Sequence, residues 1–285
     1  EQLPKYHIIR RRTEVQASST WVPPRGTLGR ILELTRRRLP SLDGDRTVER
    51  DPRADSPRQP FGSALRRQTV AIIAEFKRRS PSKGSLNDAL DARQTAEFER
   101  GGAAAISVLT EPEFFGGSLD DLRTTRASVR LPLLRKDFHI DPSQLDQARS
   151  AGASAVLLIA RALSPEELPR LMSAARERDL EPLVEVRSEA ELERAIEANA
   201  GIIGVNSRDL ETLEVDERVP ERLIPLIPPH VIAVWESGVR EVQDVRGAAA
   251  AGADAVLVGS VLSKANDPAQ VVRELSNVPR KPRAG

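Results

Sequence analysis

Short apolar runs alternate with longer amphipathic segments along the chain from residue 69 onward. The runs are rich in β-branched residues and are followed by polar loops, a pattern typical of strands. Eight strands are therefore predicted, over residues 70–76, 104–109, 131–134, 155–159, 182–186, 202–205, 231–235 and 255–258.

The segments between these strands have helical length and helical periodicity. They predict helices over residues 89–100, 119–128, 142–151, 165–178, 189–198, 221–227, 239–251 and 269–275. The runs AVLLI and AVLV, at 155–159 and 255–258, are apolar without alternation, as expected for strands covered on both faces. Eight strands alternating with eight helices favour a closed α/β fold, a (β/α)8 TIM barrel, over an open sheet.

A weak internal repeat supports this pattern. Gly102, Gly152 and Gly252 each precede a similar small apolar segment, GAAAI, GASAV and GADAV. At each place a glycine is expected just past a helix end, where a left-handed backbone is needed before the next strand.

The ends of the chain follow a different pattern. Residues 1–68 are rich in Arg, Pro and Ser and predict one helix, from Thr27 to about Arg38; residues 43–59 read as a linker. The expected division is an N-terminal extension over 1–68, a catalytic barrel over 69–278 and a basic C-terminal tail over 279–285.

The composition of the chain excludes several classes of function. A net charge of +1 gives no general attraction to nucleic acid or to a membrane surface. There is no cysteine, and His7, His139 and His230 lack metal-ligand spacing, so no metal is expected. No apolar stretch is long enough for a spanning helix or a signal peptide, so we expect a cytoplasmic protein. We also expect a monomer or weak homo-oligomer.

Polar residues gather where the predicted strands end. In a TIM barrel these ends meet at one mouth, which holds the active site. The residues are Glu75, Lys77, Lys136, Glu185, Asn206 and Glu236. Only six lysines stand against 37 arginines, yet two lie at these ends, and a desolvated lysine, unlike arginine, can be tuned toward neutral pH and serve as a proton donor.

Two glycine–serine pairs favour a phosphate site over ordinary turns. Ser237-Gly238 follows the seventh predicted strand, and Gly259-Ser260 follows the eighth. Loops after these two strands often hold a phosphate with backbone N–H groups and a helix N-terminus.

The motifs together resemble the indole-3-glycerol phosphate synthase family over about residues 69–275. The matching segments are IAEFKRRSPSKG at 73–84, FFGGSL at 114–119, LRKDF at 134–138, LVEV at 183–186, GVNSRDL at 204–210 and ESGV at 236–239. The resemblance implies conversion of 1-(2-carboxyphenylamino)-1-deoxyribulose 5-phosphate to indole-3-glycerol phosphate, with loss of carbon dioxide and water and with neither a metal nor a cofactor.

The resemblance also implies roles for the polar residues. Lys136 is expected as the general acid in ring closure, and Lys77 as the partner of the carboxylate that is lost. Glu75 and Glu185 are expected to take or relay protons, in an order that the sequence leaves open. Asn206 and Glu236 would orient the substrate and the catalytic lysine, and Arg208 would hold the anionic substrate.

The substrate-binding set follows in the same way. An apolar wall for the aromatic ring is expected from Phe115, Phe138 and Leu210. The expected phosphate ligands are Ser80, Ser237, Gly238, Gly259 and Ser260, with charge from Arg79. The extension is expected to cap the barrel mouth, where Trp21 could add a contact, and residues 80–85 are expected to form a lid.

Two residues depart from the family pattern. Trp235 stands where the family usually has a small residue, and strand alternation predicts that it faces the surrounding helices. His139 replaces an aliphatic residue and is expected to be structural. Two alternatives stay open: another phosphate-binding barrel, such as a sugar-phosphate isomerase, and a non-catalytic barrel that binds a phosphorylated ligand.

Overall fold

The computed structural model describes residues 21–42 and 59–283, and it contains a closed barrel of eight parallel strands. Around the barrel the strands follow the order β1-β10-β9-β8-β7-β6-β5-β4. They are β1 (Ala71–Phe76), β4 (Ala105–Leu109), β5 (Leu133–Lys136), β6 (Ala155–Ile159), β7 (Glu181–Val186), β8 (Ile202–Asn206), β9 (Ile232–Glu236) and β10 (Ala255–Val258). The predicted (β/α)8 TIM barrel is confirmed.

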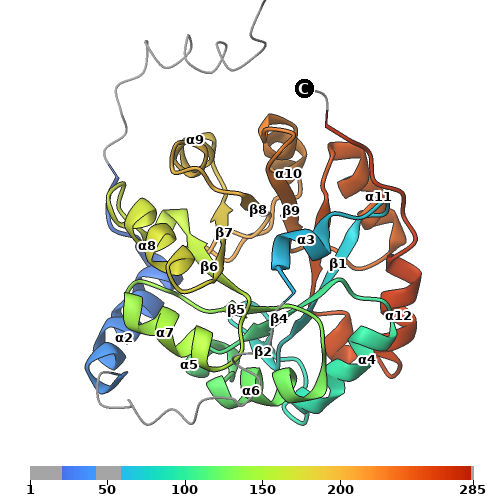
Figure 1. The fold of residues 1–285 in the computed structure, drawn as a ribbon, viewed down its shortest axis with the longest axis horizontal. Helices are drawn as coiled ribbons and strands as arrows, with labels where there is room; N and C mark the ends of the chain where they lie inside the picture. Colours follow the sequence, from blue (N-terminus) through green and yellow to red (C-terminus); the bar gives the residue numbers. More distant parts are fainter. Residues whose placement is uncertain (1–20, 43–58, 284–285) are drawn as a thin grey trace, which may run out of the picture.

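Helices surround these strands (Figure 1). They are α4 (Thr95–Arg100), α5 (Pro112–Phe115), α6 (Leu119–Ser128), α7 (Pro142–Ser150), α8 (Glu167–Arg176), α9 (Glu189–Glu197), α10 (Arg218–Leu223), α11 (Val242–Ala251) and α12 (Pro268–Leu275). Short 3-10 turns lie at η1 (Ala92–Gln94), η2 (Ala160–Ala162), η3 (Ile224–Leu226) and η4 (Leu262–Lys264). The short helix α5 and the hairpin of β2 (Arg79–Ser80) and β3 (Gly84–Ser85) were not predicted.

The third barrel strand is shifted from its predicted range of 131–134. It runs from Leu133 to Lys136, so Lys136 is the last residue of the strand. Pro132 precedes it, and proline has no N–H to give to a strand ladder, although its carbonyl accepts from the backbone N–H of Ile106. An apolar run alone did not show this start.

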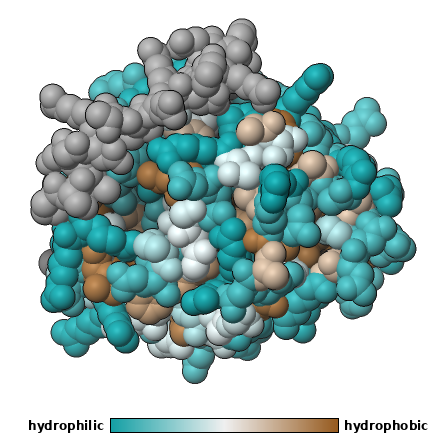
Figure 2. Space-filling model, turned by 90° about the horizontal axis from the view of Figure 1, so that it is seen from below, coloured by the Kyte–Doolittle hydropathy of each residue, from teal (hydrophilic) through white to brown (hydrophobic). Residues whose placement is uncertain are grey.

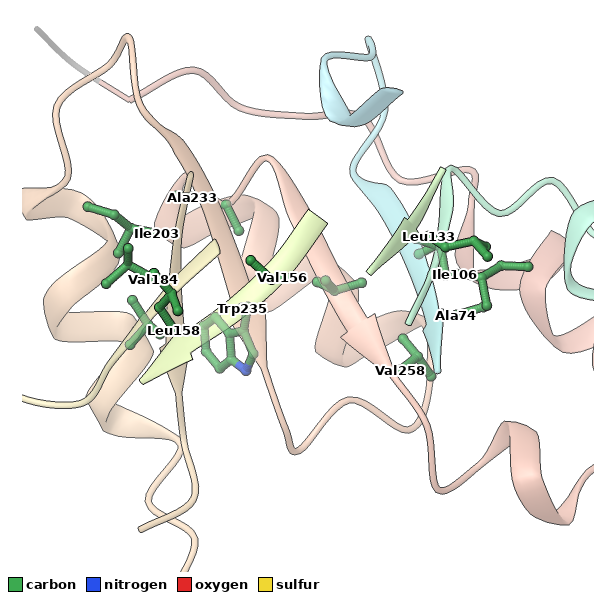
Figure 3. Packing of buried hydrophobic residues seen from close by; sticks show 14 of the residues in the cluster. Ala74, Ile106, Leu133, Val156, Leu158, Val184, Ile203, Ala233, Trp235 and Val258 are labelled. Carbon is green, nitrogen blue, oxygen red and sulfur yellow. The ribbon is translucent and has the colours of Figure 1, made fainter. Parts of the chain in front are cut away.

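Alternate strand residues divide the core into two layers. Ala71 and Ile73 of β1 point into the barrel, whereas Ile72 and Ala74 pack against the helices. Trp235 belongs to the outer layer, as predicted, and it is shown with other members of that layer in Figure 3. Because both faces of every strand are covered, the strands carry continuous apolar runs.

The three repeated glycines have the expected backbone. Gly102, Gly152 and Gly252 have φ values of 95°, 96° and 92°. These are left-handed conformations that residues with a Cβ rarely adopt, so each glycine ends a helix and turns the chain into the next strand.

The N-terminal extension contributes two helices. The predicted helix is α2 (Gly26–Leu42), and its Leu28, Ile31 and Leu32 pack into the inner layer of the core. The second is α3 (Phe61–Leu65), which is too short to show periodicity in the sequence. Most of the predicted linker, residues 43–58, lies outside the described residues.

Helix α3 and the C-terminal segment lie at the end of the barrel where the strands begin. The backbone N–H of Gly62 donates to the carboxylate of Glu181, the first residue of β7. Asp254, just before β10, pairs with Arg280 and with Arg283, the latter at 2.9 Å. Residues 279–283 are thus attached to the barrel base.

The surface on the side of α2 and α5 is mostly hydrophilic, with apolar groups between hydrophilic ones (Figure 2). Among residues 21–42 and 59–283, no helix has both the length and the apolar character needed to span a membrane.

Candidate active site

A cavity of about 440 Å³ opens among the carboxyl ends of the barrel strands. Fifteen of the sixteen predicted site residues line it. They are Glu75, Lys77, Ser80, Phe115, Lys136, Phe138, Glu185, Asn206, Arg208, Leu210, Glu236, Ser237, Gly238, Gly259 and Ser260. Residues 185 positions apart in sequence therefore face one space.

Four charged side chains form the floor of this cavity. Glu75, Lys136, Glu185 and Glu236 come from β1, β5, β7 and β9, which are the odd-numbered strands of the barrel. Side chains from alternate barrel strands share a layer, so these four residues are brought together by the closure of the sheet. The Nζ atom of Lys136 lies 3.0 Å from Glu236 Oε2 and 3.2 Å from Glu185 Oε2.

The charge of Lys136 is set by these neighbours. Burial by itself lowers the pKa of its amine, but the carboxylates of Glu236 and Glu185 raise it by more, so the net pKa lies above the ordinary value. The amine is therefore an ammonium at neutral pH in the free site. The family resemblance also led us to expect that neighbouring glutamates keep this amine charged, and the raised pKa of Lys136 agrees, because Glu236, Glu185 and Glu75 outweigh burial.

Glu236 is the group whose titration falls near neutral pH. Burial raises its pKa to about 8, with Lys136 lowering it and Glu185 raising it. Its carboxyl group is almost fully buried, and its Oε1 atom has no hydrogen-bond partner among the described residues. A proton on this group can be gained or lost during a reaction at neutral pH.

A second acid–base pair lies beside this layer. The amine of Lys77 donates to Glu75 Oε1 at 2.5 Å, and the backbone carbonyl of Lys77 accepts from Ser263 Oγ at 2.7 Å. A Cβ atom on Gly259 would lie 2.4 Å from Glu75 Oε1 and 3.1 Å from Lys77 Nζ. The glycine at this position leaves the space that the pair occupies.

The predicted phosphate loop after β9 is held by a network around Asn206. Its Oδ1 atom accepts from Ser237 Oγ at 2.8 Å and from the backbone N–H of Arg208 at 2.9 Å. Ser237 has a positive φ of 66°, and its carbonyl accepts from the indole N–H of Trp235 at 3.1 Å. Trp235 thus supports this loop from the outer layer.

An aromatic wall closes another side of the cavity. The rings of Phe115 and Phe138 lie 6.2 Å apart between centroids, at 37° to each other. Leu210 packs against the same inner layer of the core. Arg208 stands nearby, half-buried, and burial lowers the pKa of its guanidinium.

Comparison with known protein families decides between the alternative functions of this site. The model for the family described as indole-3-glycerol phosphate synthase matches residues 30–275. The chain belongs to the indole-3-glycerol phosphate synthase family. The predicted enzyme class, a carboxy-lyase of tryptophan biosynthesis, is confirmed with it.

Relatives with this name cover most of the chain. The indole-3-glycerol phosphate synthase of Kineococcus radiotolerans is 46% identical over 250 residues, which are 87% of this chain and 87% of the relative. Indole-3-glycerol phosphate synthase 1 of Streptomyces coelicolor is 51% identical over 214 residues, 75% of this chain and 80% of the relative. The match therefore spans nearly the whole barrel.

A solved structure is similar in fold alone. It is a thiamine phosphate pyrophosphorylase from Pyrococcus furiosus, with a TM-score of 0.56 and 18% sequence identity, and the match covers 74% of this chain and 95% of that one. It supports the barrel architecture, which many different activities share.

Arg79 is the predicted site residue that does not line the cavity. Its Nε atom binds Asp88 Oδ1 at 2.6 Å, and half of its side chain is exposed. Arg79 points away from the site because it stands next to Ser80 in β2, and neighbouring residues of a strand face opposite sides. Ser80 faces the cavity, with a buried Oγ that has no partner among the described residues.

Several residues of the cavity were not assigned from the sequence. Thr27 and Ile31 of α2 line the mouth, as do Lys83 and Arg240. Lys83 lies in the motif SPSKG, and the rarity of lysine in this chain was the signal that could have found it. Thr27 and Ile31 gave no such signal, because only the docking of α2 brings them to the mouth.

His139 does not line the cavity. Its ring is buried, and Nδ1 lies 2.8 Å from the carbonyl oxygen of Leu157. Burial lowers its pKa to about 4, so the imidazole is neutral at pH 7. Trp21 also contacts the barrel and not the cavity: its indole N–H donates to the carbonyl of Arg161 at 3.2 Å.

Proposed function

We propose that Lys136 is the general acid with which this chain closes the indole ring. The substrate is 1-(2-carboxyphenylamino)-1-deoxyribulose 5-phosphate, and the products are indole-3-glycerol phosphate, carbon dioxide and water. The observation that carries the proposal is the ammonium of Lys136, held at 3.0 Å from the buried carboxyl group of Glu236 and at 3.2 Å from that of Glu185.

Ring closure needs a proton at one oxygen. As the aromatic carbon that bears the carboxylate attacks the ketone carbon, a new carbon–carbon bond forms and the ketone oxygen gains negative charge. Lys136 gives that oxygen a proton and becomes a neutral amine. Loss of the carboxylate as carbon dioxide then returns the bonding electrons to the ring.

The remaining step is the loss of water. The new hydroxyl leaves with a proton from an acid, while a base takes a proton so that the indole double bond forms. Lys77, which binds the carboxylate before it is lost, is then free to serve the leaving hydroxyl, with its partner Glu75 2.5 Å away. Glu185 and Glu236 restore the proton of Lys136, and the pKa of Glu236 near 8 suits that transfer.

Binding of the two ends of the substrate sets the geometry. The phosphate binds to Ser80, Ser237, Gly238, Gly259 and Ser260, and the aromatic ring lies against Phe115, Phe138 and Leu210. Arg208 adds positive charge for the anionic substrate, while Asn206 orients its hydroxyls. Energy from binding the remote phosphate is used to hold the reacting carbons in contact.

Product fluorescence tests the proposal directly. Formation of indole-3-glycerol phosphate from the carboxyphenylamino substrate is followed for the parent and for Lys136→Met. We expect turnover by the parent and a fall in kcat of about 10²- to 10⁴-fold for the variant, the range typical of a general acid. Equal turnover by both would remove Lys136 from this role, and tight substrate binding without turnover would favour a non-catalytic barrel.

We place the enzyme in the cytoplasm, as a monomer or weak homo-oligomer, without nucleic acid, metal or cofactor as partners. Light scattering after size exclusion measures the oligomeric state, and activity after exhaustive treatment with a chelator tests the need for a metal.

A further inference from the structure

Helix α2 runs over the cavity mouth between loops that follow β8 and β4, the sixth and second strands of the barrel. At its start the backbone N–H of Thr27 donates to the carbonyl of Glu211 at 3.1 Å. Near its end the guanidinium of Arg38 binds Glu111 Oε1, also at 3.1 Å. About 1.5 Å of rise per residue lets this helix span from one side of the mouth to the other.

Glu111 is the point where α2 meets the aromatic wall. Its carboxylate is fully buried and accepts backbone N–H groups from Glu113, Phe114 and Phe115, the first turn of α5. Arg38 supplies the positive charge that this buried carboxylate faces. An acidic cap at a helix N-terminus is favourable, but a buried carboxylate that loses its cation is destabilised.

Besides this cap, helix α5 is held by Arg78, which donates to the carbonyl of Gly116 at 3.2 Å, and by Arg30 of α2, whose guanidinium lies 5.8 Å from the centre of the Phe114 ring. The helix has four residues, too few to be stable without its cap and its contacts. Its last residue is Phe115, whose ring faces the cavity next to Phe138. The position of the Phe115 ring therefore depends on the Glu111 carboxylate, which in turn depends on Arg38.

We propose that Arg38 is a positioning residue. By pairing with Glu111, it joins the docking of α2 to the placement of Phe115, and so it sets how the aromatic ring of the substrate is held. The proposal rests on the ring position given above. The phosphate end of the site, built on the loops after β9 and β10, does not depend on this pair.

Two small probes separate the two ends of the site. Anthranilate carries the ring and its carboxylate, and inorganic phosphate carries the other end. For Arg38→Met we expect the inhibition constant of anthranilate to rise roughly 2- to 30-fold, the range of coupling carried by such contacts, with KM rising in parallel. The inhibition constant of inorganic phosphate should stay within twofold of the parent value.

The chain offers a matched control on the same helix. Arg37 pairs with Glu33 on the exposed face of α2, so Arg37→Met removes the same charge without touching α5. It should leave both inhibition constants unchanged. Arg38→Lys keeps a cation near Glu111 and should recover most of the anthranilate affinity. If Arg38→Met does not fold, Glu111→Gln, which keeps an acceptor for the α5 cap, provides the same comparison.

The outcomes separate this inference from the proposed ring position. Equal losses for anthranilate and phosphate, equal effects of Arg37→Met, or no change in Arg38→Met would each overturn the role of Arg38. Phe115→Leu tests the ring position itself: unchanged anthranilate affinity in this variant would show that the ring lies elsewhere, whatever Arg38 does.

Discussion

Gly204 in β8 leaves open the space that the carboxylate of Glu236 fills. A Cβ atom at Gly204 would lie 2.0 Å from Glu236 Oε1, far inside any real contact. The two residues face each other because Gly204 stands opposite Val234 in the ladder and Glu236 follows two residues later on the same side of β9. The glycine therefore lets Glu236 reach Lys136.

Substitution of Gly204 by alanine should damage catalysis more than stability. The methyl group would push the Glu236 carboxylate away from Lys136, and a displacement of about 1 Å in an active site can cost about 10²-fold in rate. We expect a loss of that order in kcat. Gly201→Ala is the control, because a Cβ there has no neighbour within 4 Å, and its kcat should match the parent. An active Gly204→Ala variant would show that Glu236 can work from another position.

The titration of Glu236 predicts a pH dependence of stability. Its pKa in the folded chain, about 8, lies above the ordinary value of 4.5, so the folded state binds this proton more tightly than the unfolded state does. The stabilisation is complete below about pH 4.5 and is lost as the pH rises through 8. Between pH 6 and 9 the parent should therefore lose stability relative to Glu236→Gln, as measured by urea unfolding. Parallel pH profiles of the two proteins would refute the raised pKa.

Lys83 should contribute to substrate affinity. It lines the cavity. Burial lowers the pKa of its amine most, and the positive charges of Arg208, Lys264 and Lys77 lower it further. An amine in such a place favours an anion from the substrate. We expect Lys83→Met to raise KM several-fold, roughly the effect of one partly exposed charged hydrogen bond, with the difference shrinking in high salt.

The matched control for Lys83 is Lys281→Met, which removes the same charge from an exposed position in the C-terminal segment. KM of that variant should equal the parent value at every salt concentration. If both variants raise KM alike, net charge and not the place of Lys83 is responsible.

Loss of the ion pairs at the base of the barrel should lower stability but leave activity unchanged. Asp254 is largely buried and pairs with Arg280 and Arg283, and its Oδ2 accepts the backbone N–H of Ala233. Asp254→Ala leaves these cations unpaired, which should cost about 3 kcal/mol of unfolding free energy. Because Asp254 lies at the end opposite to the cavity, kcat at low temperature should be unchanged.

An exposed aspartate provides the comparison for Asp254. Asp146 pairs with Arg178 at 2.8 Å, but most of its side chain is in solvent. Asp146→Ala should cost about 0–1 kcal/mol, as is usual for surface pairs. Similar losses of unfolding free energy for both variants in urea would mean that the ion pairs of Asp254 with Arg280 and Arg283 add little stability.

Much of the architecture was predictable from local pattern. Strands such as 155–159 are continuously apolar because helices cover both faces, and Gly102, Gly152 and Gly252 mark helix ends because only glycine adopts their backbone easily. The site was predictable for a related reason: in a parallel barrel every strand end reaches the same mouth. The sequence therefore already places a polar residue at a strand end in the mouth of the barrel.

The sequence by itself determined the barrel, its eight strands and the residues at the mouth, since periodicity and motif order are local properties of a chain. Only the tertiary structure decided which of these groups act on one another. The raised pKa values of Lys136 and Glu236 and the Arg38–Glu111 contact depend on distances between residues that are far apart in the sequence. Burial and charge act through space, and those distances exist only once the sheet has closed.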